Sequence, residues 1–467
     1  MKGSSAWSHA PYAPLMWDTG DIYICRVVPY ETSIHFEWLA MEANEYSIFY
    51  RVRGEGEFVC AGSTAACEFD IRNLSSDTDY EFYVCADGKQ SRVRLARCGA
   101  VEGTVVNYLH PEDEVYAFAG RYLCSPSLLR HPDGFLLASM DLYAPAAPQN
   151  LTLIFRSDDD GETWHYVSEL CPCFWGKLFV HRGVLYMLAV STEYGDLLIG
   201  KSTDGGKTFS APVALLRGFS AILSSNRESF RRVGVHKNPQ NLVSYKGRLY
   251  ETLEWGSWVV KFRHAAMVMS MDENDDPMCP ESWHFSEPVK YDPAWQGTAP
   301  DGIAGNLEGT LCVSSDGTLY NMMRYQTQEE KKILAYRVNT DDPDAPLEFS
   351  HAVEFPANLS KFMIKYDAVS QRYFSIACRR LDEPATKRNL LSLFSSKDLE
   401  HWEVVCDLLD KRHEDPEKIG FQYVDFEMEG DDILYLCRTA INNANSFHDA
   451  NYSIFHRIVN FRDLLKK

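Results

Sequence analysis

The sequence predicts an all-β chain, in which a six-bladed β-propeller is preceded by a small β-sandwich. Three patterns support this fold class. Short runs of alternating apolar and polar residues fill most of the first hundred positions, a strand–turn–strand unit then recurs, and a polar turn that ends in an aromatic residue follows several of these units. A chain of 467 residues is also too long for one ordinary core, which favours two domains, or one domain of repeated units plus an appendage.

The segment 20–98 has the pattern of a β-sandwich. Apolar and polar residues alternate in "IYICRVV", "SIHFEWL", "YSIFYRV" and "EFYVCA", and turn-rich breaks separate these runs. In "LSSDTDYEFYVCA", Leu74, Thr78 and Tyr80 have the spacing of a tyrosine corner, and Trp38 lies on an earlier strand. The segment therefore resembles a fibronectin type III domain, for which we expect a spacer or packing role.

Residues 100–467 contain the repeated unit, which is an apolar strand, a tight polar turn and a second apolar strand. The copies are "SLLRHPDGFLLASMD", "LFVHRGVLYMLAV", "NLVSYKGRLYETLEW", "TLCVSSDGTLYNMMR", "MIKYDAVSQRYFSIACR" and "DFEMEGDDILYLCR". Their turns lie at Gly134, Gly183, Gly247, Gly317, Gln371 and Asp431, so neighbouring copies are 49 to 70 residues apart. This is the spacing of propeller blades, whose apolar faces need neighbours to cover them. The segment "GTVVNYL", residues 103–109, is expected to supply the outer strand of the last blade and close the ring.

Two polar turns, "SDDDGETW" at 157–164 and "STDGGKTF" at 202–209, fit the pattern S-x-D-x-G-x-T-[WF]. This pattern resembles the Asp box of sialidase-type propellers. Its aspartate accepts backbone N–H bonds inside the turn, its glycine permits the turn, and its aromatic ring packs between strands. A calcium loop would need further ligands at EF-hand spacing, which are absent. We therefore expect the acidic run to be structural and to lie at the periphery of the blade.

The composition restricts the partners and the compartment. The formal net charge is -20, from 46 basic and 66 acidic residues, and no cluster of lysine and arginine offsets it, so a nucleic acid would be repelled. No apolar stretch is long enough for a signal peptide or a membrane span. The 13 cysteines are an odd number and mostly scattered, which favours free thiols in a reducing, cytoplasmic setting. We expect neither a cofactor nor a metal, and the sequence leaves the oligomeric state open.

In a propeller, the residues that begin the inner strands and end the second strands converge on one face, around the central channel. Here they combine carboxylates, cations, a tyrosine and aromatics, which suit an acidic or highly hydroxylated sugar. They are Trp175, Lys177, His236, Asn238, Glu254, Trp255, Asn306, Glu308, Arg324, Lys361, Arg379, Arg380, Gln422, Tyr423, Asp425 and Arg438. In the last blade, the loop "FHDAN" adds His448, Asp449 and Asn451 to the same face.

Each of these residues also has a structural interpretation. His236 fits a hydrogen-bonded structural histidine, and the two tryptophans Trp175 and Trp255 fit core positions. Glu308 and Arg324 fit an ion pair between blades. The "FHDAN" loop fits an Asx-turn. A metal shared by the two histidines and Asp449 is another alternative, although no ligand spacing supports it. Only convergence through the repeat favours the functional interpretation.

Residues 100–467 resemble bacterial sialidase-like proteins with Asp-box repeats, often labelled exo-alpha-sialidase. The stretches "GVHKNPQ", "GFQYVDFEMEGDD" and "FHDANYSIFHRIVNFR" look like a distinct branch of that group. Sialidases hold the substrate carboxylate with three arginines, attack with a tyrosine paired to a glutamate, and use an aspartate as acid and base. The resemblance implies that Tyr423, Glu308 and Arg324 take the roles of the tyrosine, the glutamate and one arginine.

The sequence departs from the sialidase pattern at two places. Cys124, in "LCSPSLL", stands where the first arginine is expected. Asn150 stands where the acid and base aspartate is expected, with Asp141 as a displaced substitute. Cleavage of ordinary sialosides is therefore not expected. Arg379, Arg380 and Arg438 are the candidates for rebuilding a carboxylate site for a different acid sugar.

From these residues we expect an exo-acting glycoside hydrolase that releases a terminal acidic sugar from oligosaccharides. Tyr423 and Glu308 would form the nucleophile pair. His236, His448 or Asp141 would protonate the leaving oxygen. The residues expected to bind the substrate are Arg324, Arg438, Arg379, Lys361, Trp175, Lys177, Asn238, Trp255, Asp449 and Gln422. Two alternatives stay open, a lyase that acts on a uronate and a non-catalytic glycan-binding propeller.

Overall fold

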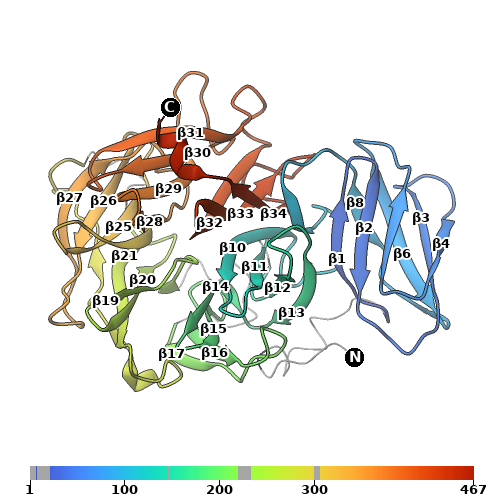
Figure 1. The fold of residues 1–467 in the computed structure, drawn as a ribbon, viewed down its shortest axis with the longest axis horizontal. Coiled ribbons are helices and arrows are strands. Elements are labelled where there is room, and N and C mark those ends of the chain that lie inside the picture. The colour runs from blue at the N-terminus through green and yellow to red at the C-terminus, as the bar shows by residue number, and fades with distance from the viewer. Residues whose placement is uncertain (1–6, 8–20, 146, 219–232, 299–304, 467) are drawn as a thin grey trace.

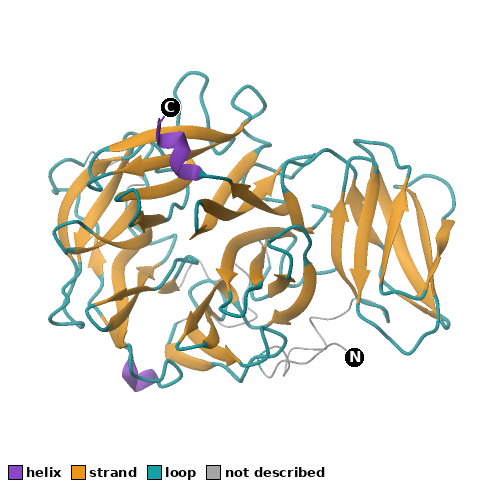
Figure 2. Ribbon diagram, in the orientation of Figure 1, coloured by secondary structure: helices purple, strands orange, loops and turns teal. Residues whose placement is uncertain are grey.

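The computed structural model describes residue 7 and residues 21–145, 147–218, 233–298 and 305–466. The chain is almost entirely β, with a sandwich next to a ring of blades (Figure 1). Only two short 3₁₀ helices occur in this part of the chain, η1 (Pro280–Ser282) and η2 (Phe461–Lys466) (Figure 2). In the described residues, no helix has the length and apolarity to cross a membrane. Residue 20, predicted to begin the sandwich, and the N-terminal residues considered for a signal peptide, except Trp7, lie outside the described residues.

The sandwich consists of two sheets that pack face to face. Its strands are β1 (Ile24–Pro29), β2 (Ser33–Trp38) and β5 (Glu68–Arg72) in one sheet, and β4 (Val59–Thr64), β3 (Tyr46–Val52), β6 (Asp79–Ala86), β7 (Lys89–Gln90) and β8 (Arg94–Arg97) in the other. Alternate residues of β6 are buried, as the sequence pattern predicts. The Tyr80 hydroxyl accepts the backbone N–H of Ser75 at 2.8 Å, which is the hydrogen bond of a tyrosine corner. Membership of the fibronectin type III family stays a prediction.

The remainder of the chain forms the six-bladed propeller that the repeats predict. The strands of blades one to three are β10 (Tyr122–Arg130), β11 (Leu136–Tyr143), β12 (Thr152–Ser157) and β13 (His165–Leu170); β14 (Phe174–His181), β15 (Val184–Val190), β16 (Leu197–Ser202) and β17 (Val213–Leu216); and β18 (Gly234–His236), β19 (Val243–Tyr245), β20 (Arg248–Gly256), β21 (His264–Asp272), β22 (His284–Phe285) and β23 (Val289–Lys290). Those of blades four to six are β24 (Asn306–Val313), β25 (Leu319–Tyr325), β26 (Lys332–Arg337) and β27 (Glu348–Glu354); β28 (Ile364–Asp367), β29 (Arg372–Cys378), β30 (Leu390–Ser396) and β31 (Trp402–Asp410); and β32 (Gly420–Glu429), β33 (Asp432–Ala440), β34 (Tyr452–Ile458) and β9 (Thr104–Tyr108).

The ring is closed by strand β9, which comes from the start of the propeller sequence. It pairs antiparallel with β34 and forms the outer strand of blade six, with Tyr452 opposite Tyr108. The prediction for residues 103–109 is therefore confirmed. The edge that β34 would otherwise expose is covered, and the first and last segments of the propeller are held together.

The sandwich is joined to the propeller by buried polar contacts as well as by shared core. The Arg26 guanidinium donates from Nε to the carbonyl oxygen of Val106 at 2.7 Å and from Nη1 to Glu37 at 2.6 Å. Arg94 forms a buried ion pair with Asp113 at 2.6 Å. Side chains of the sandwich and of blades one and six also belong to common apolar clusters. The two bodies therefore pack as one continuous structure.

The acidic turns lie at the ends of the third strands, on the face opposite the loops that follow the second strands. In the first turn, Asp159 Oδ1 accepts the N–H of Thr163 at 2.9 Å, and Ser157 Oγ accepts the N–H of Gly161 at 2.8 Å. Trp164 is fully buried, with its ring centroid 5.5 Å from that of Phe455 in blade six. The second turn repeats the bond, from Thr208 N–H to Asp204 at 2.9 Å. The acidic run thus stabilises turns and blade contacts.

Replacement of Asp159 by alanine is expected to lower the free energy of unfolding by about 1 kcal/mol and to leave ligand binding unchanged, because only the acceptor in the turn is lost. Asp158→Ala is the matched control. Among the described residues, its carboxylate pairs only with Arg156, at 2.6 Å on the surface, and its loss should change the unfolding free energy by less than about 0.5 kcal/mol. Urea unfolding measures both. Equal effects of the two substitutions would argue against the structural role of Asp159.

Candidate functional site

A bulge recurs in the inner strands of four blades. The strand ladders shift register between Cys124 and Ser127, Phe174 and Lys177, Leu307 and Gly309, and Gln422 and Asp425. Within these bulges, the residues with positive φ are Ser125 (45°), Trp175 (51°), Glu308 (52°) and Tyr423 (55°). A left-handed backbone is unfavourable for such residues and clusters at functional sites. Its recurrence at equivalent places marks the mouth as the candidate site.

Tyr423, Glu308 and Arg324 form one connected group at this mouth. The Tyr423 hydroxyl donates to Glu308 Oε1, although the two residues belong to blades six and four. The Arg324 guanidinium donates to Glu308 Oε2 at 2.7 Å, and also to the backbone oxygens of Asn358 and Leu359 at 3.1 and 2.8 Å. Arg324 is thus fixed by three acceptors. It holds Glu308 in position against the phenol.

The charges of this group are set by burial and by its own contacts. Burial raises the pKa of Glu308, but the Arg324 charge and the Tyr423 hydrogen bond outweigh it, so the pKa lies below its usual value. Burial and the adjacent Glu308 charge raise the pKa of Tyr423, against the opposing effect of three arginines. The resting pair at neutral pH is therefore a carboxylate and a protonated phenol.

Two further arginines, Arg388 and Arg438, flank the Tyr423 ring. Their guanidinium carbons lie 5.8 Å and 5.2 Å from the ring centroid. Arg388 donates to Gln422 Oε1 and, at 3.2 Å, to the Leu359 carbonyl, and burial lowers its pKa to about 10. Arg438 donates to the backbone oxygen of His448, while its Nε is buried without a hydrogen-bond partner among the described residues. Three cations therefore surround one phenol, and an anionic group is the complement they require.

The sequence reasoning missed Arg388 and named Arg379 and Arg380 in its place. Arg379 instead contacts Asp407 on the outer strand of blade five, with 3.3 Å between Nη1 and Oδ1. Arg380 donates to backbone oxygens of the loop after β25, including that of Glu330 at 3.1 Å. Arg388 precedes the third strand of its blade, whereas the sequence rule took only the starts of first strands and the ends of second strands. A search of the loops between second and third strands would have found it.

The opposite wall of the mouth is built by blades two and three. His236 Nδ1 lies 2.5 Å from Glu254 Oε2, and its ring centroid is 4.3 Å from that of Trp175. Glu254 Oε1 accepts the N–H of Gly309 at 3.1 Å, which connects this wall to the bulge at Glu308. His236 is only 1% exposed. The buried position of His236 fits a structural role in this wall, which is the hydrogen-bonded structural histidine considered from the sequence.

Glu193, which the sequence reasoning also missed, lies in the loop between β15 and β16. Its Oε1 accepts the indole N–H of Trp258 at 2.7 Å. Burial raises the pKa of Glu193 to about 7, although the Trp258 hydrogen bond and the nearby His236 oppose the shift. The "FHDAN" loop of blade six was chosen because it joins a second strand to a third. The loop "STEYGD" of blade two occupies the same place, so that signal was present in the sequence.

His448 and Asp449 lie together at the rim of the mouth. Their Nδ1 and Oδ1 atoms are 3.0 Å apart, and the His448 ring centroid is 5.2 Å from that of Tyr143. Burial and the Arg438 charge lower the pKa of His448 to about 4, despite the opposing Asp449. This histidine is neutral at neutral pH, which suits a base and not a proton donor.

Asp141 was expected as a substitute proton donor, and the structure places it beneath the bulge of blade two. Burial raises its pKa to about 7, but the residue has no exposed surface. Its carboxylate accepts the backbone N–H of Trp175 at 2.7 Å and the Thr152 hydroxyl at 2.5 Å. Asp141 therefore holds the bulge of blade two from below and cannot reach a ligand in the mouth.

Four residues expected to bind the substrate lie beneath or behind the mouth. The Lys177 ammonium lies 2.5 Å from Asp425 Oδ2, in a fully buried pair. Lys361 and Asn238 are each only 1% exposed. Gln422 is fully buried and donates to the backbone oxygen of Phe447 at 2.6 Å. Contact of these four side chains with a sugar stays a prediction, for which their burial gives no support.

Trp255 was also expected to bind the substrate. It packs against an apolar cluster shared by blades two and three. Its strand neighbour Glu254 faces the mouth, and successive side chains of a strand point to opposite faces. Trp175 keeps its place at the mouth, although it is only 8% exposed and is largely packed against Phe174, with ring centroids 4.8 Å apart.

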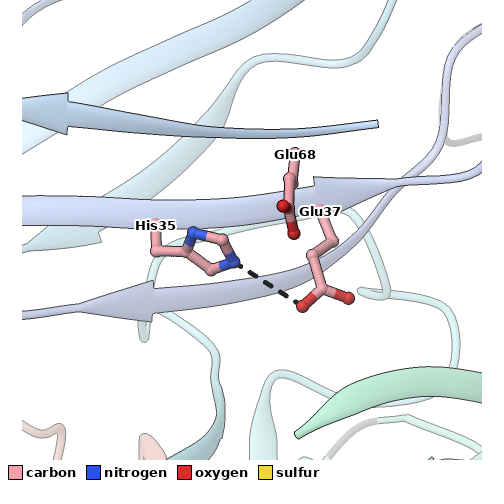
Figure 3. Close-up of side chains that lie close together, drawn as sticks. All are labelled: His35, Glu37 and Glu68. Carbon is pink, nitrogen blue, oxygen red and sulfur yellow. Dashed lines mark ion pairs between the residues drawn. The ribbon is translucent and has the colours of Figure 1, made fainter. Parts of the chain in front are cut away.

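One group of side chains in the described residues has three donor atoms close enough for a metal ion. It consists of His35, Glu37 and Glu68 in the sandwich (Figure 3). Glu37 is already paired with Arg26 at 2.6 Å and with His165 at 3.2 Å. Burial raises the pKa of Glu37, but His35 and Arg26 outweigh it and lower the value to about 2. The arginine charge opposes a second cation, so the group is an ion-pair cluster.

The alternative of a metal held by His236, His448 and Asp449 has no geometric support. Within the described part of the chain, these residues belong to no group whose ligand atoms lie within 4.8 Å of one another. Each histidine has its own carboxylate partner, Glu254 for His236 and Asp449 for His448.

Comparison with known proteins supports the fold. A scan against protein-family models finds no match, and a search of the curated proteins finds no relative. The chain is similar to an alpha-L-arabinofuranosidase from Fusarium graminearum in complex with an iminosugar inhibitor, with a TM-score of 0.50 and 13% identity over 76% of this chain and 98% of that chain. It is also similar to a leech intramolecular trans-sialidase complexed with 2,7-anhydro-Neu5Ac, with a TM-score of 0.50 and 9% identity over 98% of this chain and 96% of that chain. At such identities the likeness is one of fold.

Proposed function

We propose that this protein is a carbohydrate-active enzyme, an exo-acting glycoside hydrolase that releases a terminal acidic sugar from an oligosaccharide. The observation that carries the proposal is the contact of Tyr423 with Glu308, in a mouth where Arg324, Arg388 and Arg438 surround the phenol. The names of the arabinofuranosidase and the trans-sialidase that share the fold agree with this broad class. Fold likeness alone does not select a substrate.

The acidic sugar is inferred from the arginines. Arg324 is fixed by Glu308 and two backbone oxygens, so we assign the ligand to Arg388 and Arg438, which flank the Tyr423 ring. The unpartnered Arg438 Nε supplies one donor for a carboxylate. Because this donor is buried, leaving it without an acceptor is unfavourable, and a bound carboxylate would remove that penalty.

The mechanism that fits this geometry is a double displacement. Tyr423 Oη forms a bond to the anomeric carbon while the bond from that carbon to the leaving oxygen breaks, and the phenol proton passes to Glu308. Water then attacks the glycosyl-tyrosine, and Tyr423 recovers its proton from Glu308 as it leaves. The proton that this water releases replaces the one that the leaving oxygen takes up in the first step. The three arginines stabilise the phenolate character that develops on Tyr423 and oppose part of the pKa-raising effect of burial.

A lyase acting on a uronate is the second candidate, and His448 is the observation that favours it. A neutral histidine held by Asp449, with Arg438 3.5 Å from its Nδ1, combines a base with a cation that would neutralise the uronate carboxylate. Abstraction of the proton next to that carboxylate would expel the glycosidic oxygen and leave a carbon–carbon double bond.

A panel of oligosaccharides with terminal acidic sugars tests both candidates in one experiment. New reducing ends without ultraviolet absorption would support the hydrolase. An unsaturated, ultraviolet-absorbing product would support the lyase and overturn the hydrolase. Binding without turnover of any member of the panel would favour a non-catalytic glycan-binding propeller.

A further inference from the structure

We propose that Glu193 is the proton donor to the leaving oxygen and that Trp258 is its positioning residue. This inference rests on the proposed hydrolase, because a double displacement needs a group that protonates the departing oxygen in its first step. Neither residue was among the candidates chosen from the sequence.

Glu193 lies in the same mouth as the nucleophile pair, on the opposite side. Its loop joins β15 to β16 in blade two, and Trp258 follows β20 in blade three. In the ring of six blades, blade three lies opposite blade six, which carries Tyr423 (Figure 1). The charge of Glu193 contributes to the raised pKa of Tyr143, whose ring centroid is 6.0 Å from the guanidinium carbon of Arg438. Trp258, which donates to Glu193, has its ring centroid 5.9 Å from that of His236, so Glu193 lies on the wall that His236 supports.

Three other acids near the mouth have fixed partners or no exposed surface. Glu308 accepts hydrogen bonds from Arg324 and Tyr423. Glu254 contacts His236 and accepts the N–H of Gly309. Asp141 has no exposed surface. Glu193 has the ionisation that a donor needs, since a pKa of about 7 leaves a large protonated fraction at neutral pH.

Trp258 fixes the direction of the carboxyl. An indole N–H can only donate, so its bond to Oε1 favours placement of the acid proton on Oε2. The indole is itself held, with the Arg263 guanidinium carbon 5.2 Å from its centroid and the His264 ring centroid at 4.9 Å. The Trp258 indole thereby orients the Glu193 carboxyl without taking part in the reaction itself.

In the first step, the bond from the anomeric carbon to the leaving oxygen breaks, and that oxygen takes the Glu193 proton. In the second step, the attacking water gives a proton back to the Glu193 carboxylate, and Tyr423 recovers its own from Glu308. The protein returns to its starting state, with no other reactant than water.

The test compares two substrates of one acidic sugar, a disaccharide whose leaving group needs a proton and a 4-nitrophenyl glycoside whose leaving group does not. Glu193→Gln is expected to lower kcat/KM for the disaccharide by about 100- to 10,000-fold, while the aryl glycoside loses less than about 10-fold. For wild-type protein, kcat/KM on the disaccharide should fall as the pH rises through about 7, because the donor must be protonated. Trp258→Phe should move this limb of the pH profile to higher pH, since the indole bond favours the charged form.

Glu162→Gln, in the exposed turn on the other face, is the matched control and should behave as wild type. Tyr423→Phe should abolish turnover of both substrates, which separates the donor from the nucleophile. Equal losses on the two substrates in Glu193→Gln, with active wild-type protein, would overturn the role of Glu193 and leave the proposed function standing. Wild-type protein that cleaves neither substrate would overturn the proposed function and this inference together.

Discussion

Replacement of Tyr423 by phenylalanine is expected to lower kcat for the released acidic sugar by about 1,000-fold or more. The substitution removes only the hydroxyl that contacts Glu308, so the ring still fills its place between Arg388 and Arg438. The substrate should still bind, because the arginines that hold its carboxylate are unchanged. A large loss in kcat with a small change in KM, measured on folded protein, is the expected result.

Tyr366→Phe is the matched control for this substitution. Tyr366 is 51% exposed on blade five, and loss of its hydroxyl should leave turnover unchanged. If Tyr423→Phe retained turnover within about 10-fold of wild type, attack by the phenol would be excluded, and water or another group would have to act as the nucleophile.

The largest effect on stability is expected at Lys177, in the layer below the mouth. Lys177→Met leaves the fully buried Asp425 carboxylate without its ion-pair partner, 2.5 Å away in the intact protein. Removal of one member of a buried pair typically destabilises a protein by about 3–5 kcal/mol. The free energy of unfolding, followed by urea, should fall by this amount. Asp425 also lies two residues after Tyr423, so the loss should be accompanied by weaker catalysis.

The control is the double substitution Lys177→Met with Asp425→Leu. Replacing both charges by apolar side chains of similar size is expected to recover most of the lost stability, since neither charge of the pair is then left buried without the other. A double variant less stable than Lys177→Met would show that the pair itself, and not the isolated charge, stabilises the channel. In that case the ion pair would be a net stabilising element of the propeller.

The fold was predictable because each blade repeats one pattern. Six hairpins and two acidic turns determined the number of blades, and the apolar strand at 103–109 indicated how the ring closes. These features depend on local spacing, which a single sequence displays. The bulges were not predictable, because glutamate and tyrosine do not indicate a positive φ, although Glu308 and Tyr423 both have one.

The candidate site was predictable in part. Tyr423, Glu308 and Arg324 were found because they begin inner strands or end second strands, and the structure brings them into contact. Lys177 also lies near the start of an inner strand, but its side chain is buried against Asp425 below the mouth. Arg388 lies in a loop, where the repeat assigns no fixed position. The sequence rule therefore located the mouth but not all of the residues that line it.

The stereochemistry of the first product tests the central proposal most directly. If Tyr423 attacks the anomeric carbon and water then displaces it, two inversions occur, and the sugar must be released with its original anomeric configuration. Proton NMR spectra recorded within the first minutes of turnover, before mutarotation, distinguish the two anomers. Retention of configuration is the predicted result. Release of the inverted anomer, or of an unsaturated sugar, would contradict a glycosyl-tyrosine intermediate.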